Sequence, residues 1–372
     1  MAEIKSTFFE TCMGVFQGGG CRAAAFAGAL SEASTRGVDF AGVAGTSAGS
    51  IVAALIAAGA SSDQVHATLT KMDFAEMVKP PDSSSSKSKW LERAKARGAN
   101  LIKDGARDLL LHQGLHSSQG IDRWVNDELK KLLPEVKDIR IRFEHLVKPL
   151  WVVAADIMSS DVKIWSQDQT PTEDVAFAVR CSCSIPLFFQ PVNGRYVDGG
   201  LLSNLPSFVF SDPAGSVYAK RILAFLLESE PSDAQNNSLT SLLESLVDTA
   251  VNGATRVQFR LTPDVHEIRI PTGDLKATEF ERMDNKMIGT LVANGTAATK
   301  EFFNDELSRV APREVGHSVC EGDDEVYAVL AEALVTRTAQ HVIICDESAR
   351  CLYPIFPSLL AWRMKGVRIS AY

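Results

Sequence analysis

A run of 23 residues without a single charged side chain, Phe40–Ser62, is the feature that most restricts how this chain folds. A run of that length is sufficient to cross the hydrocarbon core of a bilayer as a helix. Buried strands and helices of a globular domain lack charge as well. The fold therefore depends on which of these two origins the run has.

The local pattern inside the run favours a buried strand and a buried helix. Residues 40–45 form a short apolar stretch that is typical of a strand. Residues 50–58 have the composition of a buried helix, and Gly59 follows as a C-terminal cap. Between them lies the pentapeptide Gly45-Thr-Ser-Ala-Gly49. We expect a strand, a tight turn and a helix in place of a membrane span.

The pentapeptide has the G-x-S-x-G form of a nucleophile elbow, with Ser47 at its centre. In such an elbow the serine lies in a sharp turn, and the flanking glycines, Gly45 and Gly49, let neighbouring backbones approach. The helix N-terminus behind the serine favours developing negative charge. A serine in an ordinary strand-to-helix turn fits the same pentapeptide, so this motif alone does not identify an enzyme.

A second motif, Gly18-Gly19-Gly20-Cys21-Arg22, lies between a predicted strand and a predicted helix. Consecutive glycines let several backbone N–H groups turn toward one point, which suits an oxyanion hole or a phosphate cradle. A P-loop is excluded because no Gly-Lys-Ser/Thr follows. A dinucleotide fingerprint stays open, although Ala23 replaces its third glycine, because Asp39 stands near the expected acidic position. A glycine turn that serves packing alone is the remaining interpretation.

A third motif contains Asp198, followed by Gly199 and Gly200, at the end of a short predicted strand. A carboxylate at a strand end is carried to the edge of a sheet, where functional residues are common. Aspartate is also a frequent turn former. Taken alone, Asp198 fits a turn as well as it fits catalysis.

Composition and charge limit the class of protein. Apolar residues make up 45% of the chain and charged residues 23%, which is typical of a globular enzyme and not of a disordered chain. The net charge of −8 argues against a nucleic-acid partner. Seven scattered cysteines and the absence of a secretory pattern in the first residues predict a cytoplasmic protein with reduced thiols. Cys181 and Cys183 are too close in sequence for a zinc knuckle, so no metal is expected.

Together and in this order, the three motifs resemble those of patatin-like phospholipases. Residues 149–156 and 178–186, and Asn204-Leu-Pro206, are also similar to that family. The resemblance covers roughly residues 12–210 and extends loosely to about 305. It implies an α/β, three-layer fold with a mostly parallel central sheet and helices on both faces.

The resemblance also implies how the chain is divided. Residues 1–310 would form a patatin-like acyl hydrolase domain. Residues 311–372 fit the family less well and would form a C-terminal α/β extension, either packed on the core or regulatory. Within this extension, strands are predicted at 341–345 and 366–370.

For the chemistry, the resemblance implies a serine acyl hydrolase with a Ser–Asp dyad and no cofactor. Asp198 would take the hydroxyl proton while Ser47 attacks a lipid ester, so that an acyl-enzyme forms. Within the loop Gly18–Arg22, the N–H groups around Gly19, Gly20 and Cys21 would stabilise the oxyanion. Arg22 would hold the loop or attract a phosphate headgroup.

The implied substrate is a phospholipid, reached by peripheral contact with a membrane. The loop-rich stretch 79–111 contains five basic residues between 87 and 97 and is a candidate lid or lipid-contacting segment. A solvated helix beside a flexible loop explains the same stretch.

Other functions stay open. One is a triad esterase that uses Ser47, a later aspartate and one of His266, His317 or His341. Another is a non-catalytic lipid-binding module on the same scaffold. The chain is also similar in general form to bacterial anti-phage phospholipases that cyclic nucleotides switch on. This resemblance implies a nucleotide activator. No nucleotide pocket is recognisable in the sequence.

Overall fold

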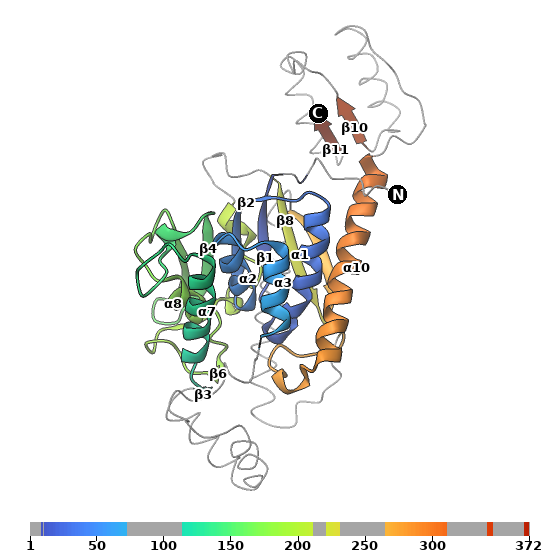
Figure 1. Ribbon diagram of the computed structural model, residues 1–372. Coiled ribbons are helices and arrows are strands. Elements are labelled where there is room, and N and C mark those ends of the chain that lie inside the picture. The colour runs from blue at the N-terminus through green and yellow to red at the C-terminus, as the bar shows by residue number, and fades with distance from the viewer. Residues whose placement is uncertain are drawn as a thin grey trace. The chain divides into compact units, whose positions relative to one another are not determined.

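The computed structural model describes residues 9, 11–72, 114–210, 221–230 and 265–310, and the backbone of 341–344 and 368–371. By its internal contacts the chain forms two compact units, residues 1–307 and residues 308–372. The first unit is a layered α/β structure (Figure 1).

The first unit is built on a seven-stranded, mostly parallel sheet. Its strands are β1 (Cys12–Phe16), β2 (Phe40–Thr46), β4 (Leu150–Asp156), β5 (Asp161–Ser166), β7 (Tyr196–Asp198), β8 (Ile222–Glu228) and β9 (Val265–Pro271). The order is β5-β4-β2-β1-β8-β9, with β7 paired to β4. Strands β4, β2, β1, β8 and β9 run parallel to one another, whereas β5 and β7 run antiparallel to β4. A small separate sheet pairs β3 (Gly114–His116) with β6 (Leu187–Phe189).

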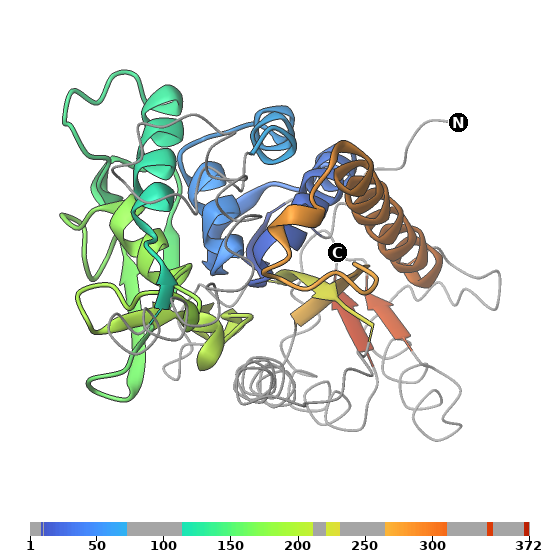
Figure 2. The ribbon, with the colours of Figure 1, turned by 90° about the horizontal axis from the view of Figure 1, so that it is seen from below.

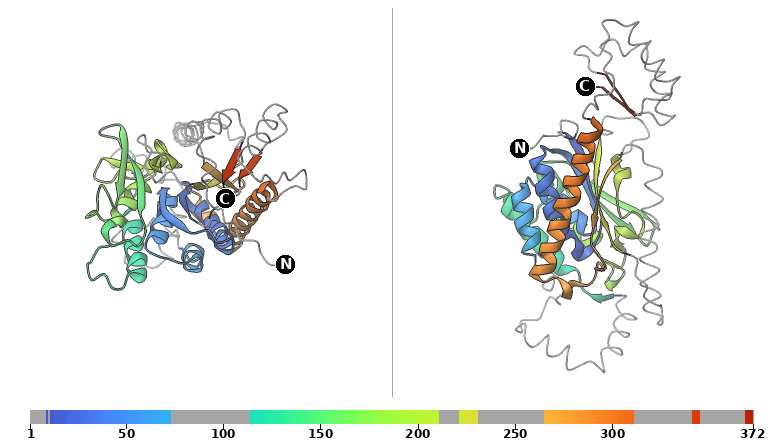
Figure 3. Two further views of the ribbon diagram at one scale, coloured as in Figure 1. Left: turned by 90° about the horizontal axis from the view of Figure 1, so that it is seen from above. Right: turned by 90° about the vertical axis from the view of Figure 1, so that its right-hand side faces the viewer.

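The described helices of this unit lie on one face of the large sheet, where α3 packs mainly on α1 and α7 packs mainly on α8 (Figures 1 and 2). They are α1 (Ala25–Thr35), α2 (Ala48–Ala57), α3 (Ser62–Thr70), α7 (Gln119–Leu132), α8 (Val175–Ser182) and α10 (Asn285–Val310). The right-hand view of Figure 3 shows α10 running beside α1. A Cβ atom on Gly28 of α1 would lie 1.9 Å from the carbonyl oxygen of Val292, and one on Gly295 would lie 2.0 Å from that of Ala25. Glycine therefore sets the distance between these two helices.

The opposite face of the sheet packs on a smaller apolar cluster. Met13, Ala44 and Trp151 of the sheet share this cluster with Leu205 and Phe210. The rings of Trp151 and Phe210 meet edge to face, with centroids 5.0 Å apart. Phe210 belongs to the 3₁₀ helix η5 (Ser207–Phe210), which lies on this face. The remaining 3₁₀ helices are η2 (Gly20–Ala24), η3 (Phe143–His145), η4 (Gly199–Leu201) and η6 (Phe280–Arg282). Among the described residues, no longer helix lies on this face.

The prediction of an α/β fold with a mostly parallel central sheet is confirmed.

The uncharged run at 40–62 forms a buried strand and a buried helix. It supplies β2 and α2, and every residue of α2 is buried. None of the helices in the described ranges is long and apolar enough to cross a membrane. The lack of charge is explained by burial between a sheet and its helical layer.

Gly49 offers a direct test of this packing. A Cβ atom there would lie 2.2 Å from the carbonyl oxygen of Phe16, which belongs to the backbone of β1 and has little room to move. We expect Gly49→Ala to lower the free energy of unfolding by about 1–3 kcal/mol. The matched control is Gly289→Ala in α10, where nothing lies within 4 Å of the added Cβ atom. The control should raise it by about 0.5–1 kcal/mol. Equal effects in urea unfolding would contradict the close approach of α2 and β1.

The second unit contributes two described strands, β10 (His341–Ile344) and β11 (Arg368–Ala371). They pair in parallel. Both overlap the strands predicted from the sequence, and the rest of residues 311–372 lies outside the described ranges.

Candidate active site

The register of β4 brings Ser47 and Asp198 together. β2 pairs with one edge of β4 as far as Thr46, whose partner is Val153. Because β5 occupies the other edge, β7 continues along the same edge as β2, and Asp198 faces Ala154. The end of β2 and the end of β7 are therefore opposite consecutive residues of β4. Ser47 follows Thr46 directly and so lies beside Asp198.

Ser47 is held in a backbone conformation that few non-glycine residues adopt. Its φ is 53° and its ψ is −133°. It is 4% exposed and directly precedes the first residue of α2. Its N–H donates to the Ser182 hydroxyl at 2.8 Å, and its carbonyl oxygen accepts from the N–H and the hydroxyl of Ser50 at 2.8 and 2.6 Å. This conformation is typical of the predicted nucleophile elbow and costs about 1–3 kcal/mol.

Asp198 is buried, and its carboxyl lies close enough to the Ser47 side chain to interact with it. Its Oδ1 also accepts the N–H of Gly200 at 2.7 Å. Burial raises the pKa of the carboxyl from 3.8 to about 6, and the hydrogen bonds from Ser47 and Gly200 oppose that rise. A carboxyl group with a pKa near 6 is ionised at neutral pH and is still basic enough to accept a proton.

The raised pKa predicts opposite pH dependences for stability and activity. The folded protein holds the Asp198 proton more tightly than the unfolded chain, because the folded pKa of about 6 lies above 3.8. The contribution of Asp198 to the free energy of unfolding is therefore fully present below about pH 3.8 and is lost as pH rises through about 6, by roughly 3 kcal/mol in total. Hydrolysis that uses the carboxylate as a base should instead rise through the same pH range. Urea unfolding and kcat/KM, both measured from pH 4.5 to 8, check this, and a kcat/KM that does not change with pH would contradict it.

The glycine loop passes directly beside Ser47. A Cβ atom on Gly18 would lie 2.9 Å from the Ser47 Cβ atom. The Gly18 N–H donates to the Asn204 carbonyl oxygen at 3.0 Å, and the Asn204 side-chain amide donates back to the Gly18 carbonyl oxygen at 3.3 Å. Arg22 Nε donates to the Gly19 carbonyl oxygen at 3.1 Å. This contact joins two residues of the same loop.

The structure differs from expectation at Cys21. Its N–H donates to the Ala277 carbonyl oxygen at 3.0 Å, and its thiol donates to the Lys276 carbonyl oxygen at 3.3 Å. The N–H of Cys21 is thus engaged within the protein and is not directed at a bound ester. The N–H groups of Gly19 and Gly20 have no hydrogen-bond partner among the described residues and are the better candidate donors. Burial raises the pKa of the Cys21 thiol to about 12, so this thiol is not a nucleophile.

An apolar pocket adjoins Ser47. Its wall includes Ile51 of α2, Leu69 of α3 and Ile121 of α7, and Phe189 and Phe280 also line it. Apolar pockets with few polar groups bind apolar ligands. This one suits a hydrocarbon chain whose reacting end lies at Ser47.

Two of the alternatives place their key residue at the wrong end of the sheet. Asp39 immediately precedes β2, whereas the glycine loop follows the parallel strand β1, so a dinucleotide cannot contact both as the fingerprint requires. His266 lies at the start of β9, which is also the end opposite Ser47, and its ring packs edge-on against Phe9. It cannot serve as the base of a triad. His317 lies outside the described residues, and His341 belongs to the second unit.

Several residues around the site had no role assigned from the sequence. Ser50, Ser182, Ser184 and Asn204 all donate to or accept from the backbone of the site. Asn204 and the stretch 178–186 were noted only for their family-like pattern. The Ser50 contact is local, three residues from Ser47, but the contacts of Ser182, Ser184 and Asn204 join segments that meet only in the folded chain. The sequence contains no signal for these three.

The chain also resembles known proteins in sequence. The family described as patatin-like phospholipase matches residues 14–210, which is more than half of the chain. The uncharacterized protein YqhO of Bacillus subtilis is 29% identical over 306 residues, covering 78% of this chain and 97% of that protein. A probable lipid hydrolase, 463L, of Invertebrate iridescent virus 6 is 25% identical over 208 residues, covering 55% of this chain and 64% of that protein.

The fold is also similar to a solved structure. The crystal structure of VipD from Legionella pneumophila aligns with a TM-score of 0.51 and 16% identity, and the alignment covers 96% of this chain and 79% of that one. At this identity the likeness concerns the fold alone. With the match of the family over residues 14–210, the chain belongs to the patatin-like phospholipase family and is a lipid acyl hydrolase.

Proposed function

We propose that this protein hydrolyses fatty-acyl esters of membrane phospholipids, with Ser47 as the nucleophile and Asp198 as the general base. The observation that carries the proposal is the position of the buried Asp198 carboxyl beside Ser47, which the pairing of β2 and β7 with β4 brings together next to an apolar pocket. A base beside the hydroxyl removes the need for a histidine between them. The helix α2 behind Ser47 adds a favourable field for an oxyanion.

The reaction follows from these positions. Asp198 accepts the hydroxyl proton while the Ser47 Oγ attacks the ester carbonyl carbon, whose oxygen becomes an oxyanion near the N–H groups of Gly19 and Gly20. The bond to the glycerol oxygen then breaks, and the proton on Asp198 passes to that oxygen. Water next attacks the acyl-enzyme and gives a proton to Asp198. The fatty acid leaves as Ser47 recovers its proton from Asp198.

The experiment that tests the function measures products and the reacting residue together. The protein is incubated with vesicles of mixed phospholipids, and the released lipids are identified by mass spectrometry. Fatty acid and lysophospholipid should appear in equal amounts, and a fluorophosphonate probe should modify Ser47. If neither product nor adduct forms, the hydrolase mechanism is wrong and the lipid-binding module is favoured.

The proposal includes peripheral contact with the membrane, for which the β4–β5 turn offers a surface. Ile157 and Met158 follow directly after β4, at the end of the sheet that carries Ser47 and Asp198, and are 44% and 73% exposed. Exposed apolar side chains next to an active site are suited to insertion among lipid headgroups. The basic stretch 87–97 and the candidate lid 79–111 lie outside the described residues and stay predictions.

We expect Met158→Asp to lower the rate on phospholipid vesicles about threefold to tenfold, because a charge replaces an inserting side chain. The rate on a short-chain, water-soluble ester should not change. The matched control is Val147→Asp, since Val147 is 66% exposed but precedes β4 at the other end of the sheet. Equal losses for the two variants in a vesicle assay would contradict a membrane contact at the β4–β5 turn.

Regulation and location complete the proposal. Activation by a nucleotide second messenger in antiviral defence rests on the general form of the chain, with residues 308–372 as the available regulatory unit. Adding cyclic nucleotides to the vesicle assay tests this activation, and an unchanged rate with each would contradict it.

A cytoplasmic location is consistent with Cys12, Cys21, Cys181 and Cys183, which are free thiols.

A further inference from the structure

The geometry points to Ser182, at the C-terminal end of α8, as the positioning residue that holds the backbone of Ser47 in its reactive conformation. The inference rests on the proposed function, because it assigns Ser182 an effect on the attack by Ser47. Ser182 itself touches neither the ester nor Asp198 in this assignment. It acts through the Ser47 N–H.

The Ser182 hydroxyl links two backbone segments of the site. It accepts the N–H of Ser47 at 2.8 Å and donates to the carbonyl oxygen of Val153 at 2.5 Å. Val153 is the residue of β4 that pairs with Thr46, directly before Ser47. Ser182 is fully buried, so water cannot replace its hydroxyl without a rearrangement. One hydroxyl thus ties the turn at Ser47 to the strand that sets the register of the site.

The same segment also holds Asp198. The carbonyl oxygen of Ser184 accepts the N–H of Asp198 at 2.8 Å. Residues 182 and 184 therefore fix the backbones of the two reacting residues, Ser47 and Asp198, from one short piece of chain. A shift of that piece would change the distance between the Ser47 hydroxyl and the Asp198 carboxylate.

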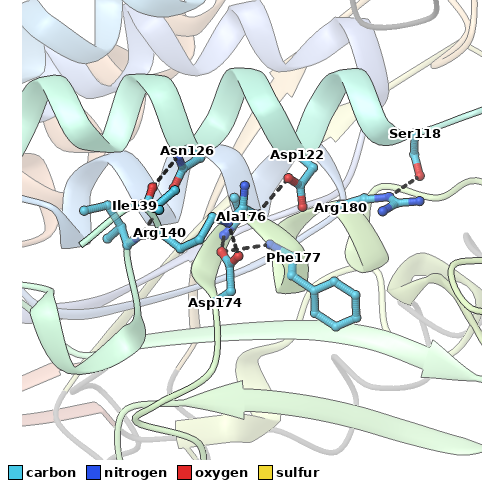
Figure 4. Close-up of polar contacts among 10 residues, drawn as sticks. Ser118, Asp122, Asn126, Ile139, Arg140, Asp174, Ala176, Phe177 and Arg180 are labelled. Atoms are coloured by element: carbon cyan, nitrogen blue, oxygen red, sulfur yellow. Dashed lines mark hydrogen bonds and ion pairs between the residues drawn. The ribbon is translucent and has the colours of Figure 1, made fainter. Parts of the chain in front are cut away.

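Contacts with α7 hold this piece of chain in place. The Ser184 hydroxyl bonds to the Ser118 hydroxyl at 2.9 Å and to the Arg180 carbonyl oxygen at 2.8 Å. Figure 4 shows Arg180 reaching back to Ser118, a contact of 3.1 Å. The same view shows Arg140 bound to Asp122 of α7 and to Asp174. Asp174 caps the start of α8, so one end of this helix is linked to α7 through Arg140 and the other to Ser118, the residue directly before α7.

The conformation of Ser47 explains why such a tie is needed. A non-glycine residue with a φ of 53° tends to relax toward negative φ unless its surroundings hold it. The Ser47 N–H is buried, and an unpaired buried N–H is unfavourable. Without the Ser182 hydroxyl, both effects favour rotation of the Ser47 backbone, which would move its hydroxyl away from Asp198.

The test compares Ser182→Ala and Ser182→Cys with the matched control Ser166→Ala. A thiol is a weak acceptor of similar size, so the cysteine variant should lie between wild type and Ser182→Ala. Ser166 is equally buried, and its hydroxyl accepts the backbone N–H of Gln169. It pairs with Trp151 near the start of β4, away from the site. Each variant is assayed with a soluble ester and a fluorophosphonate, and its free energy of unfolding is measured.

We expect Ser182→Ala to lower kcat at least about tenfold with KM within about twofold, and to slow Ser47 labelling in parallel. The acid side of its pH profile should move to higher pH, because the Ser47 hydrogen bond lowers the pKa of Asp198. A role in stability alone would not move that pH profile. Ser166→Ala should keep the kcat and pH profile of wild type.

Two results would overturn the inference. One is a Ser182→Ala variant with the kcat, labelling rate and pH profile of wild type. The other is an equal loss in Ser166→Ala, which would mean that any buried serine has this effect. If the wild type neither hydrolyses esters nor reacts with the probe, the proposed function fails instead. Hydrogen exchange at the Ser47 amide then decides the positioning role, which requires faster exchange in Ser182→Ala than in Ser166→Ala.

Discussion

Replacing Ser47 with alanine is expected to lower kcat for phospholipid hydrolysis at least about 10⁴-fold. Removing the nucleophile of an acyl-transfer site leaves only oxyanion stabilisation and substrate binding. The apolar wall that includes Leu69 and Phe280 remains, so KM should change little. Initial rates on vesicles measure the loss, and labelling by a fluorophosphonate at residue 47 should disappear.

Ser31→Ala is the matched control for this substitution. Ser31 lies in α1, and its hydroxyl donates to the Ala27 carbonyl oxygen of the same helix at 2.9 Å. Its removal should leave kcat within about twofold of wild type. Retention of most activity in a folded Ser47→Ala variant would rule out Ser47 as the nucleophile.

Asp198→Asn should produce the second largest loss, about 10³- to 10⁴-fold in kcat. Asparagine has the shape of aspartate but cannot take the hydroxyl proton of Ser47. The same substitution should raise the free energy of unfolding at pH 7, because burial of an ionised carboxylate with a raised pKa is unfavourable. Rates and urea unfolding at pH 7 should therefore change in opposite directions, which separates lost chemistry from lost folding.

A second buried carboxylate serves as the control for Asp198. Asp156 ends β4 and is 4% exposed, but Arg195 donates to its Oδ2 from Nε at 2.7 Å and lowers the pKa of the carboxyl. Asp156→Asn should therefore lower stability and leave kcat of the folded protein near that of wild type. A loss of kcat as large as that of Asp198→Asn would contradict a special role for Asp198.

The strand-turn-helix around Ser47 could be predicted from the sequence because its signals are local. Flanking glycines, a short apolar stretch and a helical composition all lie within residues 40–59, and the structure places β2, Ser47 and α2 there. The mostly parallel α/β sheet followed from the resemblance carried by three ordered motifs. The contact of Ser47 with Asp198 needed both that resemblance and the register across β4, which no short stretch encodes.

What the sequence could not predict are contacts between segments distant in the chain. The N–H of Cys21 was expected to face the substrate, but the Ala277 carbonyl oxygen binds it. Whether a backbone N–H is available depends on which remote carbonyl group folds against it, and composition does not report that. Ser182 is a similar case. A serine at a helix end is common, and only its contact with the Ser47 N–H in the folded chain points to its role.

The pairing of both reacting residues with β4 has a consequence for how the chain tolerates insertions. Because Thr46 and Asp198 are aligned with Val153 and Ala154, chain length gained between β2 and β4 does not alter the separation of Ser47 and Asp198. Deleting one residue inside β4 would instead turn every following side chain to the other face of the sheet. Circular permutants and loop grafts should therefore be made in the connections and never within residues 150–156.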